Sequence, residues 1–222
     1  MEGVRELRGR GLSPKLIARS LGVSQSVVVP LIRVIAAADQ VDIAEQPVVG
    51  CWVNTSWSSG LAFDGHPEWL DCPSDMGGLA RVLVAREQTR RRPHSVCGYL
   101  VDVYCLGVKN AYGPEPKSDA ELVEFRREYF RGEDYTAAPL ELARQLVFGA
   151  VDYARGLGFE PHPDFAKVSG HLGAWSGGSD ITFGKGGKPL FVQGPYDNAP
   201  SVVRTLDRTV GPGNFDYLVT GY

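Results

Sequence analysis

The sequence predicts a protein of the α+β class, in which a small helical unit precedes a mixed-sheet α/β domain with two or three packed helices. Two short capped helix patterns lie near the N-terminus, apolar strand-like runs lie at 79–87 and 96–108, and longer helix patterns lie at 118–131 and 139–157. In the larger part the strands come mainly before the helices, which favours an α+β arrangement over a doubly wound parallel sheet.

Composition and charge indicate three segments: a helical unit at 1–37, a linker at 38–47 and a domain at 48–222. The linker is acidic, weakly patterned and closed by Pro47. Residues 1–38 carry six basic and two acidic side chains, a net charge of +4, whereas the whole chain carries −3, which leaves −7 for the remainder. A basic N-terminal part on an acidic body predicts that a polyanion meets the N-terminus first.

The cell compartment is predicted from the apolar runs and the cysteines. The first residues form no apolar signal-peptide stretch, and the run at 27–32 is far shorter than the roughly 20 residues of a membrane span. The four cysteines form no C-x-x-C pair, and Cys97 and Cys105 would lie too far apart on one strand for a disulfide. We expect a cytoplasmic protein with reduced thiols and no membrane partner.

Local signals predict the two N-terminal helices and the tight turn between them. Ser13 is placed to cap the first helix, Pro14 suits its first position, and Gly22 can adopt the left-handed conformation that ends it. Ser24 is placed to cap the second helix, and a preceding helix near 3–10 would complete a trihelical unit. The apolar contacts are expected from Ile17, Ala18, Leu21, Val23, Val27 or Val28, Leu31 and Ile35.

Residues 11–13, 17–18 and 21–24 together resemble the helix-turn-helix of resolvases, sigma-factor region 4 and many bacterial regulators. In that motif the second helix enters the major groove, and its first side chains contact base edges. The resemblance implies base contacts from Ser24, Gln25 and Ser26, with Val29 as a further position. It implies phosphate contacts from Lys15, Arg19 and Arg33.

Pro30 departs from this motif because it lies inside the predicted second helix. It removes a backbone hydrogen bond at a cost of about 3 kcal/mol, so the helix should kink or restart there. The reading positions hold no arginine, lysine or asparagine, and only Gln25 could read adenine. Our first hypothesis is a DNA-binding transcriptional regulator. The alternatives are a helix-turn-helix used for dimerisation or protein contact, and a plain structural cap.

The larger domain combines apolar runs with glycine-rich turns. The runs at 79–87 and 96–108 are apolar on both faces, which suits central strands. The other expected elements are a strand at 48–53, a long loop at 54–78, a polar hairpin tip at 88–94, a hairpin at 181–193 turning at Gly186 and Gly187, a helix from Pro200 to Gly211, and a final strand at 215–219 that could return to the sheet.

Residues 48–220 resemble an uncharacterised bacterial family through the motifs VDVYCLGVKN (101–110) and FGKGGKPLFVQGPYDN (183–198). The resemblance implies a shared fold and brings no activity. Asp102 lies in an otherwise apolar strand, with Lys109 and Asn110 at its exit. A buried carboxylate needs a partner, so Asp102 is either a hydrogen-bonded structural group or part of a site. Asp102, Lys109 and Asn110 are therefore the weak catalytic candidates of an alternative hypothesis, an enzyme acting on nucleic acid or a nucleotide.

Other candidate groups favour structural interpretations. Glu115 and Lys117 resemble the Glu-x-Lys of metal-dependent nucleases, but flanking prolines predict a surface loop. His162, His171 and Asp164 match no metal-ligand spacing, so we expect no metal and no cofactor. The possible nucleophiles, none within a Gly-x-Ser-x-Gly elbow, are Ser56, Ser58, Ser59, Cys51 and Cys72.

Two further groups depend on how the domain folds. A second polyanion contact would form if the tip at 90–92, which holds three arginines, converged with Lys185 and Lys188. Four aromatic residues could line a pocket or cover a core: Trp52, Trp57, Phe63 and Trp69. The partners expected with the first hypothesis are DNA, a second copy of the chain, and a small-molecule or protein effector.

Overall fold

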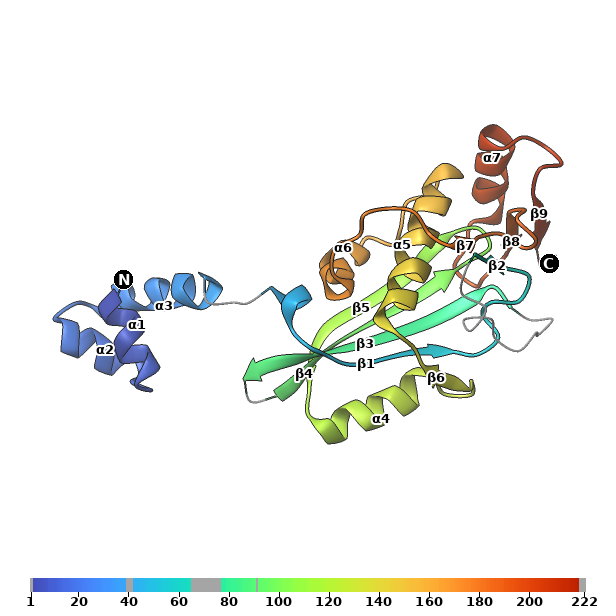
Figure 1. Ribbon diagram of the computed structural model, residues 1–222. Coiled ribbons are helices and arrows are strands. Elements are labelled where there is room, and N and C mark those ends of the chain that lie inside the picture. Colours follow the sequence, from blue (N-terminus) through green and yellow to red (C-terminus); the bar gives the residue numbers. More distant parts are fainter. Residues whose placement is uncertain (1, 39–41, 65–76, 91, 220–222) are drawn as a thin grey trace. The chain divides into compact units, whose positions relative to one another are not determined.

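The computed structural model describes residues 2–38, 42–64, 77–90 and 92–219. The chain divides into two compact units, Met1–Glu45 and Gln46–Tyr222, and each is described by itself (Figure 1). The described residues form seven α-helices and a five-stranded antiparallel sheet, which places the protein in the predicted α+β class. A short 3₁₀ helix, η1 (Ile43–Glu45), ends the first unit.

The first unit consists of three helices, α1 (Glu2–Gly9), α2 (Pro14–Leu21) and α3 (Gln25–Ala38). As predicted, the Ser13 hydroxyl accepts the Leu16 N–H at 3.4 Å, and Gly22 ends α2 with φ of 66°. A small apolar core holds the helices together. Its buried members are Val4, Ile17, Ala18 and Val28, with Leu7, Leu12, Leu31 and Ile32 packed around them.

Two expectations for this unit are wrong. Leu21 and Val23 lie outside its core, with 40% and 42% of their surface exposed. The Ser24 hydroxyl lies 2.7 Å from the Ser26 hydroxyl, so it bonds to a side chain in place of the expected backbone N–H. Of the two effects expected at Pro30, a kink or a restart, the restart does not occur, because α3 continues through this residue to Ala38. The packing of the surrounding turns outweighs the single backbone hydrogen bond that Pro30 removes.

The second unit is built on a sheet with strand order β5-β4-β3-β1-β6. Every neighbouring pair in it is antiparallel, so the prediction of a mixed main sheet is wrong. The runs predicted as central strands do lie inside the sheet, as β3 and β4. The strands are β1 (Val48–Asn54), β3 (Leu79–Arg90), β4 (Arg92–Asp102), β5 (Gly107–Lys117) and β6 (Tyr135–Ala137).

The predicted single strand at 96–108 is in fact the end of β4, a tight turn and the start of β5. Asp102 pairs with Gly107 across this turn, and Gly107 has φ of 66°, a conformation that favours glycine. Cys97 and Cys105 therefore do not share a strand. Glu115 and Lys117 lie on β5, so the predicted surface loop there is also wrong.

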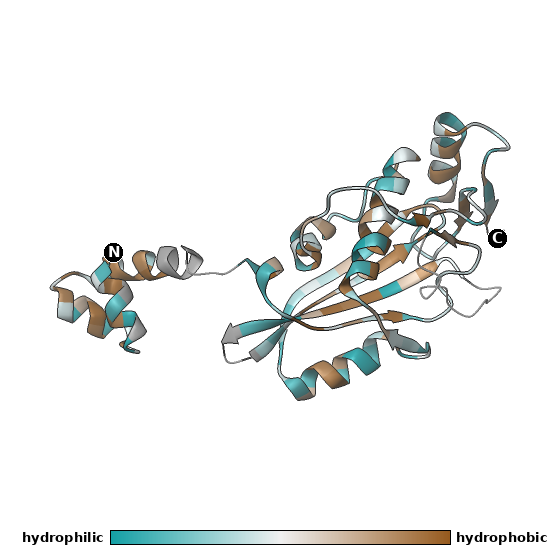
Figure 2. Ribbon diagram, viewed as in Figure 1, coloured by the Kyte–Doolittle hydropathy of each residue, from teal (hydrophilic) through white to brown (hydrophobic). Residues whose placement is uncertain are grey.

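Helices cover both faces of the sheet. On one face α5 (Leu140–Gly156) and the short α6 (Phe165–Val168) pack against Val82 and Val84. On the other face α4 (Asp119–Tyr129) packs against Leu83 and Ala85 (Figure 1). Figure 2 shows the apolar residues concentrated along the middle strands. The alternation of side chains along β3 thus supplies two cores, which explains why its sequence is apolar on both faces.

The C-terminal part forms a smaller layer with its own core around Phe191, Leu206 and Phe215. Here β8 (Leu190–Val192) pairs in parallel with β9 (Asp216–Leu218), and α7 (Ala199–Thr209) packs on them. The final strand therefore does not return to the main sheet.

The predicted hairpin at 181–193 keeps only its turn, where Lys185 bridges Lys188. Its first arm, β7 (Ile181–Thr182), pairs instead with β2 (Ala62–Phe63), which lies in the segment predicted as a long loop. A second 3₁₀ helix, η3 (Ser169–Leu172), follows α6.

Candidate nucleic-acid interface

The geometry of α2 and α3 is set by a three-residue turn, 22–24. The axis of α3 over Gln25–Ile32 is turned by 119° from that of α2. The turn is held by the Val23 N–H, which donates to the Ala18 carbonyl at 3.0 Å. Ile17 and Val28 are both fully buried, one on each helix. The angle between the helices is therefore fixed by hydrogen bonds and by a shared core.

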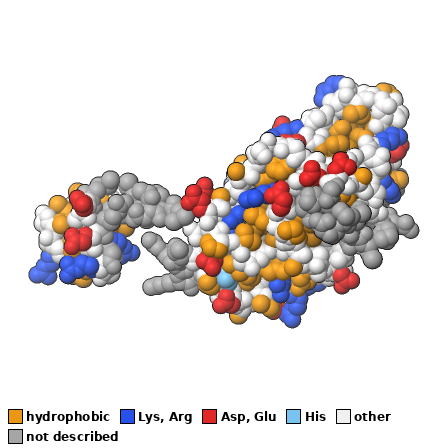
Figure 3. All heavy atoms as spheres, in the orientation of Figure 1, with side chains coloured by type: hydrophobic (Ala, Val, Ile, Leu, Met, Phe, Trp, Pro, Cys, Tyr) orange, Lys and Arg blue, Asp and Glu red, His pale blue; other side chains and the backbone are white. Residues whose placement is uncertain are grey.

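The structure brings the expected base-reading residues together on one exposed turn. Ser24, Gln25 and Ser26 are all exposed at the start of α3. Lys15 and Arg19 are exposed on one side of α2, opposite to buried Ile17. Figure 3 shows basic side chains on the surface of this unit. Arg33 lies on α3, but its side chain is outside the described residues.

One exposed residue of this surface was missed by sequence reasoning. Val27 has half of its surface exposed, whereas Val28 is fully buried. Neighbouring positions on a helix point about 100° apart, so only one of the two valines can face the core. The sequence left this choice open, and no local signal in a run of three valines could have decided it. Val29 is partly buried.

Asp102 in the second unit is a structural group. Its carboxylate accepts the backbone N–H groups of Tyr104, Cys105 and Leu106 at 2.9, 3.0 and 3.2 Å, which fixes the turn between β4 and β5. Burial raises the pKa of Asp102 to about 6, and these N–H groups and Lys109 offset part of the shift. The oxygens of this carboxylate thus accept hydrogen bonds that hold the turn.

Lys109 lies near enough to Asp102 to lower its pKa, but the hydrogen bonds of Lys109 and Asn110 go to other groups. The Lys109 Nζ lies 2.5 Å from Asp197 Oδ2, and both side chains are largely buried. Asn110 is exposed, and its side-chain oxygen accepts the N–H of Ala111 at 2.8 Å. The three candidates therefore serve three separate local contacts.

Residues 101–110 and residues 183–198 lie against each other. The Gly184 N–H donates to the Val103 carbonyl at 3.0 Å, and the Leu190 N–H donates to the Tyr104 carbonyl at 3.2 Å. The Lys109–Asp197 pair adds a charged contact between the same segments. These motifs thus attach the C-terminal layer to the end of the sheet.

The nuclease-like pair is remote from Asp102. The Lys117 Nζ lies 2.5 Å from Glu115, and it also lies over the Phe125 ring. Glu115 pairs with Val96, near the start of β4, whereas Asp102 ends that strand. At about 3.4 Å per residue, some 20 Å of strand separate the two carboxylates. They cannot hold one metal ion.

The histidines and the possible nucleophiles also lie in structural surroundings. His171 is buried, its Nε2 lies 2.9 Å from the Ser95 carbonyl oxygen, and burial lowers its pKa. His162 Nδ1 lies 3.7 Å from Asp164. Among the described residues no group of three or more His, Cys, Asp or Glu side chains is placed to hold a metal ion.

The nucleophile candidates that the structure describes lie on β1 and in the turn that follows it. Burial raises the pKa of the Cys51 thiol to about 12, and Ser58 is buried. The Ser59 carbonyl accepts the Tyr104 hydroxyl, and Ser56 adopts φ of 70° in the turn that follows β1. Cys72 lies outside the described residues.

The two basic tips do not converge. Arg90 ends β3 and Arg92 begins β4, whereas Gly184 bonds to Val103 just after β4 ends. The length of β4 therefore separates the tips by about 34 Å. Lys188 also pairs with Asp216 at 2.8 Å, whereas Lys185 is exposed. Residue 91 and the side chains of Arg90 and Arg92 are outside the described residues.

The aromatic residues cover cores. Trp57 is buried and meets Phe63 edge to face at 5.5 Å between ring centroids. Trp52 lies on the other face of the sheet, where the Arg126 guanidinium sits 4.7 Å from its ring. Trp69 lies outside the described residues.

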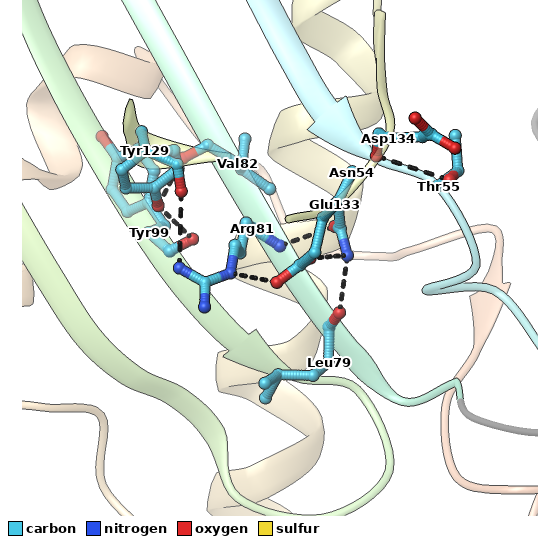
Figure 4. Close-up of polar contacts among 9 residues, drawn as sticks. All are labelled: Asn54, Thr55, Leu79, Arg81, Val82, Tyr99, Tyr129, Glu133 and Asp134. Atoms are coloured by element: carbon cyan, nitrogen blue, oxygen red, sulfur yellow. Dashed lines mark hydrogen bonds and ion pairs between the residues drawn. The ribbon is translucent and has the colours of Figure 1, made fainter. Parts of the chain in front are cut away.

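A polar network beside α4 fixes the segment that follows this helix (Figure 4). Arg81 Nε donates to Glu133 at 2.7 Å, and the Asn54 amide donates to the other oxygen of Glu133 at 2.9 Å. Asn54 Oδ1 in turn accepts the Arg81 N–H at 2.8 Å. A shallow groove of about 390 Å³ next to this network is lined mainly by exposed ion pairs of α4. Such a groove carries no convergent polar groups typical of a ligand site.

Within the described ranges no single helix is long and apolar enough to cross a membrane, and only the bent pair α2 and Gln25–Ile32 meets the length and composition criteria. Comparison of the chain with models of known protein families, with curated proteins and with solved structures finds no match.

Proposed function

We propose that this protein binds duplex DNA through α2 and α3 and acts as a transcriptional regulator. The observation that carries the proposal is the 119° turn between α2 and Gln25–Ile32 across three residues. DNA-binding helix-turn-helix motifs join their helices at about 90–120° through a turn of three or four residues. The exposed residues 24–26 then occupy the positions from which such motifs contact bases.

The charge distribution supports the same proposal. The net charge of residues 1–38 is +4 in a chain of net charge −3. Lys15 and Arg19 are exposed, and Arg8 is held by a hydrogen bond to the Leu12 carbonyl at 3.1 Å. Phosphate contacts from such side chains supply most of the sequence-independent affinity for DNA. The second unit, with its separate cores, would then serve for sensing, dimerisation or partner binding.

The test compares two pairs of charge substitutions in the full chain. Lys15→Gln/Arg19→Gln removes two proposed phosphate contacts, and Lys185→Gln/Arg208→Gln is the control at exposed sites of the second unit. Duplex binding is followed by fluorescence anisotropy across a salt series. We expect the first pair to reduce the slope of log K against log salt by about 2, and the control to leave it unchanged. Equal slopes for all three proteins would contradict the proposal.

A second function, contact with another protein, is favoured by one observation. Four apolar side chains of the first unit are exposed by 40–51%: Leu16, Leu21, Val23 and Val27. An apolar surface of this kind occurs at protein–protein contacts. Sedimentation of the wild-type chain and of Leu16→Ser/Val23→Ser discriminates the two functions. The protein contact would be favoured by two results together. The wild-type chain would self-associate without binding DNA, and the double substitution would abolish the self-association. The enzyme alternative gains no support, because Asp102, Lys109 and Asn110 lie in separate contacts.

A further inference from the structure

The exposed first turn of α3 has an unusual composition for a surface that meets a polyanion. Residues 20–32 contain no charged side chain. The hydroxyls of Ser24 and Ser26 bond to each other at 2.7 Å, which occupies them locally. Gln25 therefore supplies the long hydrogen-bonding side chain of this turn, and Val27 supplies an apolar side chain that is 50% exposed.

Base pairs present different edges in the major groove. Guanine presents two acceptors, which arginine or lysine recognises, and α3 has neither in its first two turns. Adenine presents one acceptor and one donor, which match the amide of a glutamine. Thymine presents a methyl group, which an exposed apolar side chain can contact. The available chemistry of this turn thus complements A·T pairs and not G·C pairs.

We propose that Gln25 and Val27 are the specificity-determining residues of α3 and that they read A·T base pairs. Gln25 bonds to N7 and N6 of adenine, and Val27 contacts the 5-methyl group of thymine. The two lie on either side of Ser26, each about 100° from it around the helix axis, so they contact different base pairs. The inference rests on the proposed function, because it requires α3 to lie in the major groove.

The next exposed position along α3 limits the number of base pairs that this helix can read. Pro30 lies one turn after Ser26, is exposed, and has no hydrogen-bonding side chain. The reading is therefore confined to the first turn of α3 and to a few base pairs. The basic side chains of Lys15 and Arg19 on α2 supply charge complementarity to the duplex without contacting the bases.

The test uses a duplex selected from a random library by the full chain, prepared in three forms. The first contains thymine, the second contains uracil, which lacks only the methyl group, and the third contains 7-deazaadenine, which lacks the N7 acceptor. Kd is measured by anisotropy for the wild type, Val27→Ala and Gln25→Ala. Val23→Ala is the matched control, since Val23 is a valine of similar exposure, 42% against 50% for Val27, outside the first turn of α3.

We expect the wild type to bind the uracil duplex about fourfold more weakly, the effect of one methyl contact. Val27→Ala should bind the thymine and uracil duplexes equally, and Val23→Ala should keep the fourfold difference. We expect the wild type to prefer adenine over 7-deazaadenine by about five- to tenfold, and Gln25→Ala should lose this preference.

The outcomes separate failure of the inference from failure of the proposed function. Selection of G·C-rich duplexes, or equal wild-type affinity for the thymine and uracil forms, overturns the inference while DNA binding stands. If Val27→Ala weakens self-association and uracil has no effect on DNA affinity, Val27 belongs to a protein contact. That result also overturns the inference. Absence of binding to every duplex, at low salt and with a folded protein by circular dichroism, overturns both.

Discussion

Replacement of Lys109 by methionine tests whether the two sequence motifs of the second unit have a structural role. Lys109 and Asp197 form a 2.5 Å ion pair with 19% and 13% of the side chains exposed. Without Lys109, Asp197 keeps the Gly194 N–H at 2.7 Å as its hydrogen-bond donor and lies as an uncompensated charge in a largely dry site. Breaking a fully buried pair costs 3–5 kcal/mol, so with this residual exposure we expect Lys109→Met to lower the free energy of unfolding by about 2–4 kcal/mol.

The assay is urea denaturation of the full chain followed by tryptophan fluorescence. All four tryptophans belong to the second unit, so the signal does not report on the helices of the first. Lys109→Met/Asp197→Asn is the matched variant, and it should be more stable than Lys109→Met because it leaves no buried charge. A loss below about 0.5 kcal/mol for Lys109→Met would refute the reasoning, since that is the behaviour of an exposed pair.

Three further predictions concern the same unit. The pKa of Asp102 in the folded protein, about 6, lies above its ordinary value of 3.8, so the folded state binds the proton more tightly. The stability that protonation of Asp102 contributes is therefore complete below pH 3.8 and is lost as the pH rises through 6. The free energy of unfolding of the wild type minus that of Asp102→Asn should therefore fall by about 2 kcal/mol from pH 4 to pH 7, and a rise measured by urea titration would contradict this. Ser118→Ala removes the capping box of α4 and should cost about 1 kcal/mol in the same assay, whereas Ser176→Ala, at an exposed site, should cost nothing measurable; equal costs would argue against the cap. The three described cysteines are buried, and burial raises the pKa of the Cys51 and Cys97 thiols to about 12, so in a Cys72→Ser background native protein should not react with a disulfide reagent at pH 8; rapid reaction would show that these thiols are accessible.

The elements that the sequence predicts well are those with local signals. The capping box at Ser118 and Glu121 places the start of α4, and the apolar stripe from Leu142 to Leu157 places α5. Ser13, Pro14 and Gly22 define α2 in the same way. These signals depend on neighbours three or four residues apart, so they are visible without tertiary structure.

The turn after β4 was missed because its residues look like a strand. Residues 103–106 are all apolar, and the turn is held by the side chain of Asp102, not by a proline or asparagine. Gly107 was the one local sign of it. The pairing of β8 with β9 joins residues about 26 positions apart, and the pairing of β2 with β7 joins residues about 120 positions apart. The hydrophobic periodicity of the sequence does not indicate such long-range pairings.

The candidate interface shows the same limit at the level of single residues. The sequence placed Gln25 and its serine neighbours on an exposed turn, and the structure describes them there. It could not choose between Val27 and Val28, because two adjacent valines give the same hydrophobic pattern. The choice follows from the packing of α3 on Ile17, which buries Val28. The exposure of Val27 is therefore a result of tertiary contacts.

The most direct measurement of the central claim compares the full chain with residues 46–222 for binding to the same duplex DNA across a salt series. We predict that the full chain binds with a steep negative salt slope, and that the fragment does not bind although its tryptophan fluorescence shows that it is folded. Equal affinity of the two proteins, or no binding by the full chain at low salt, would contradict the assignment of DNA binding to α2 and α3.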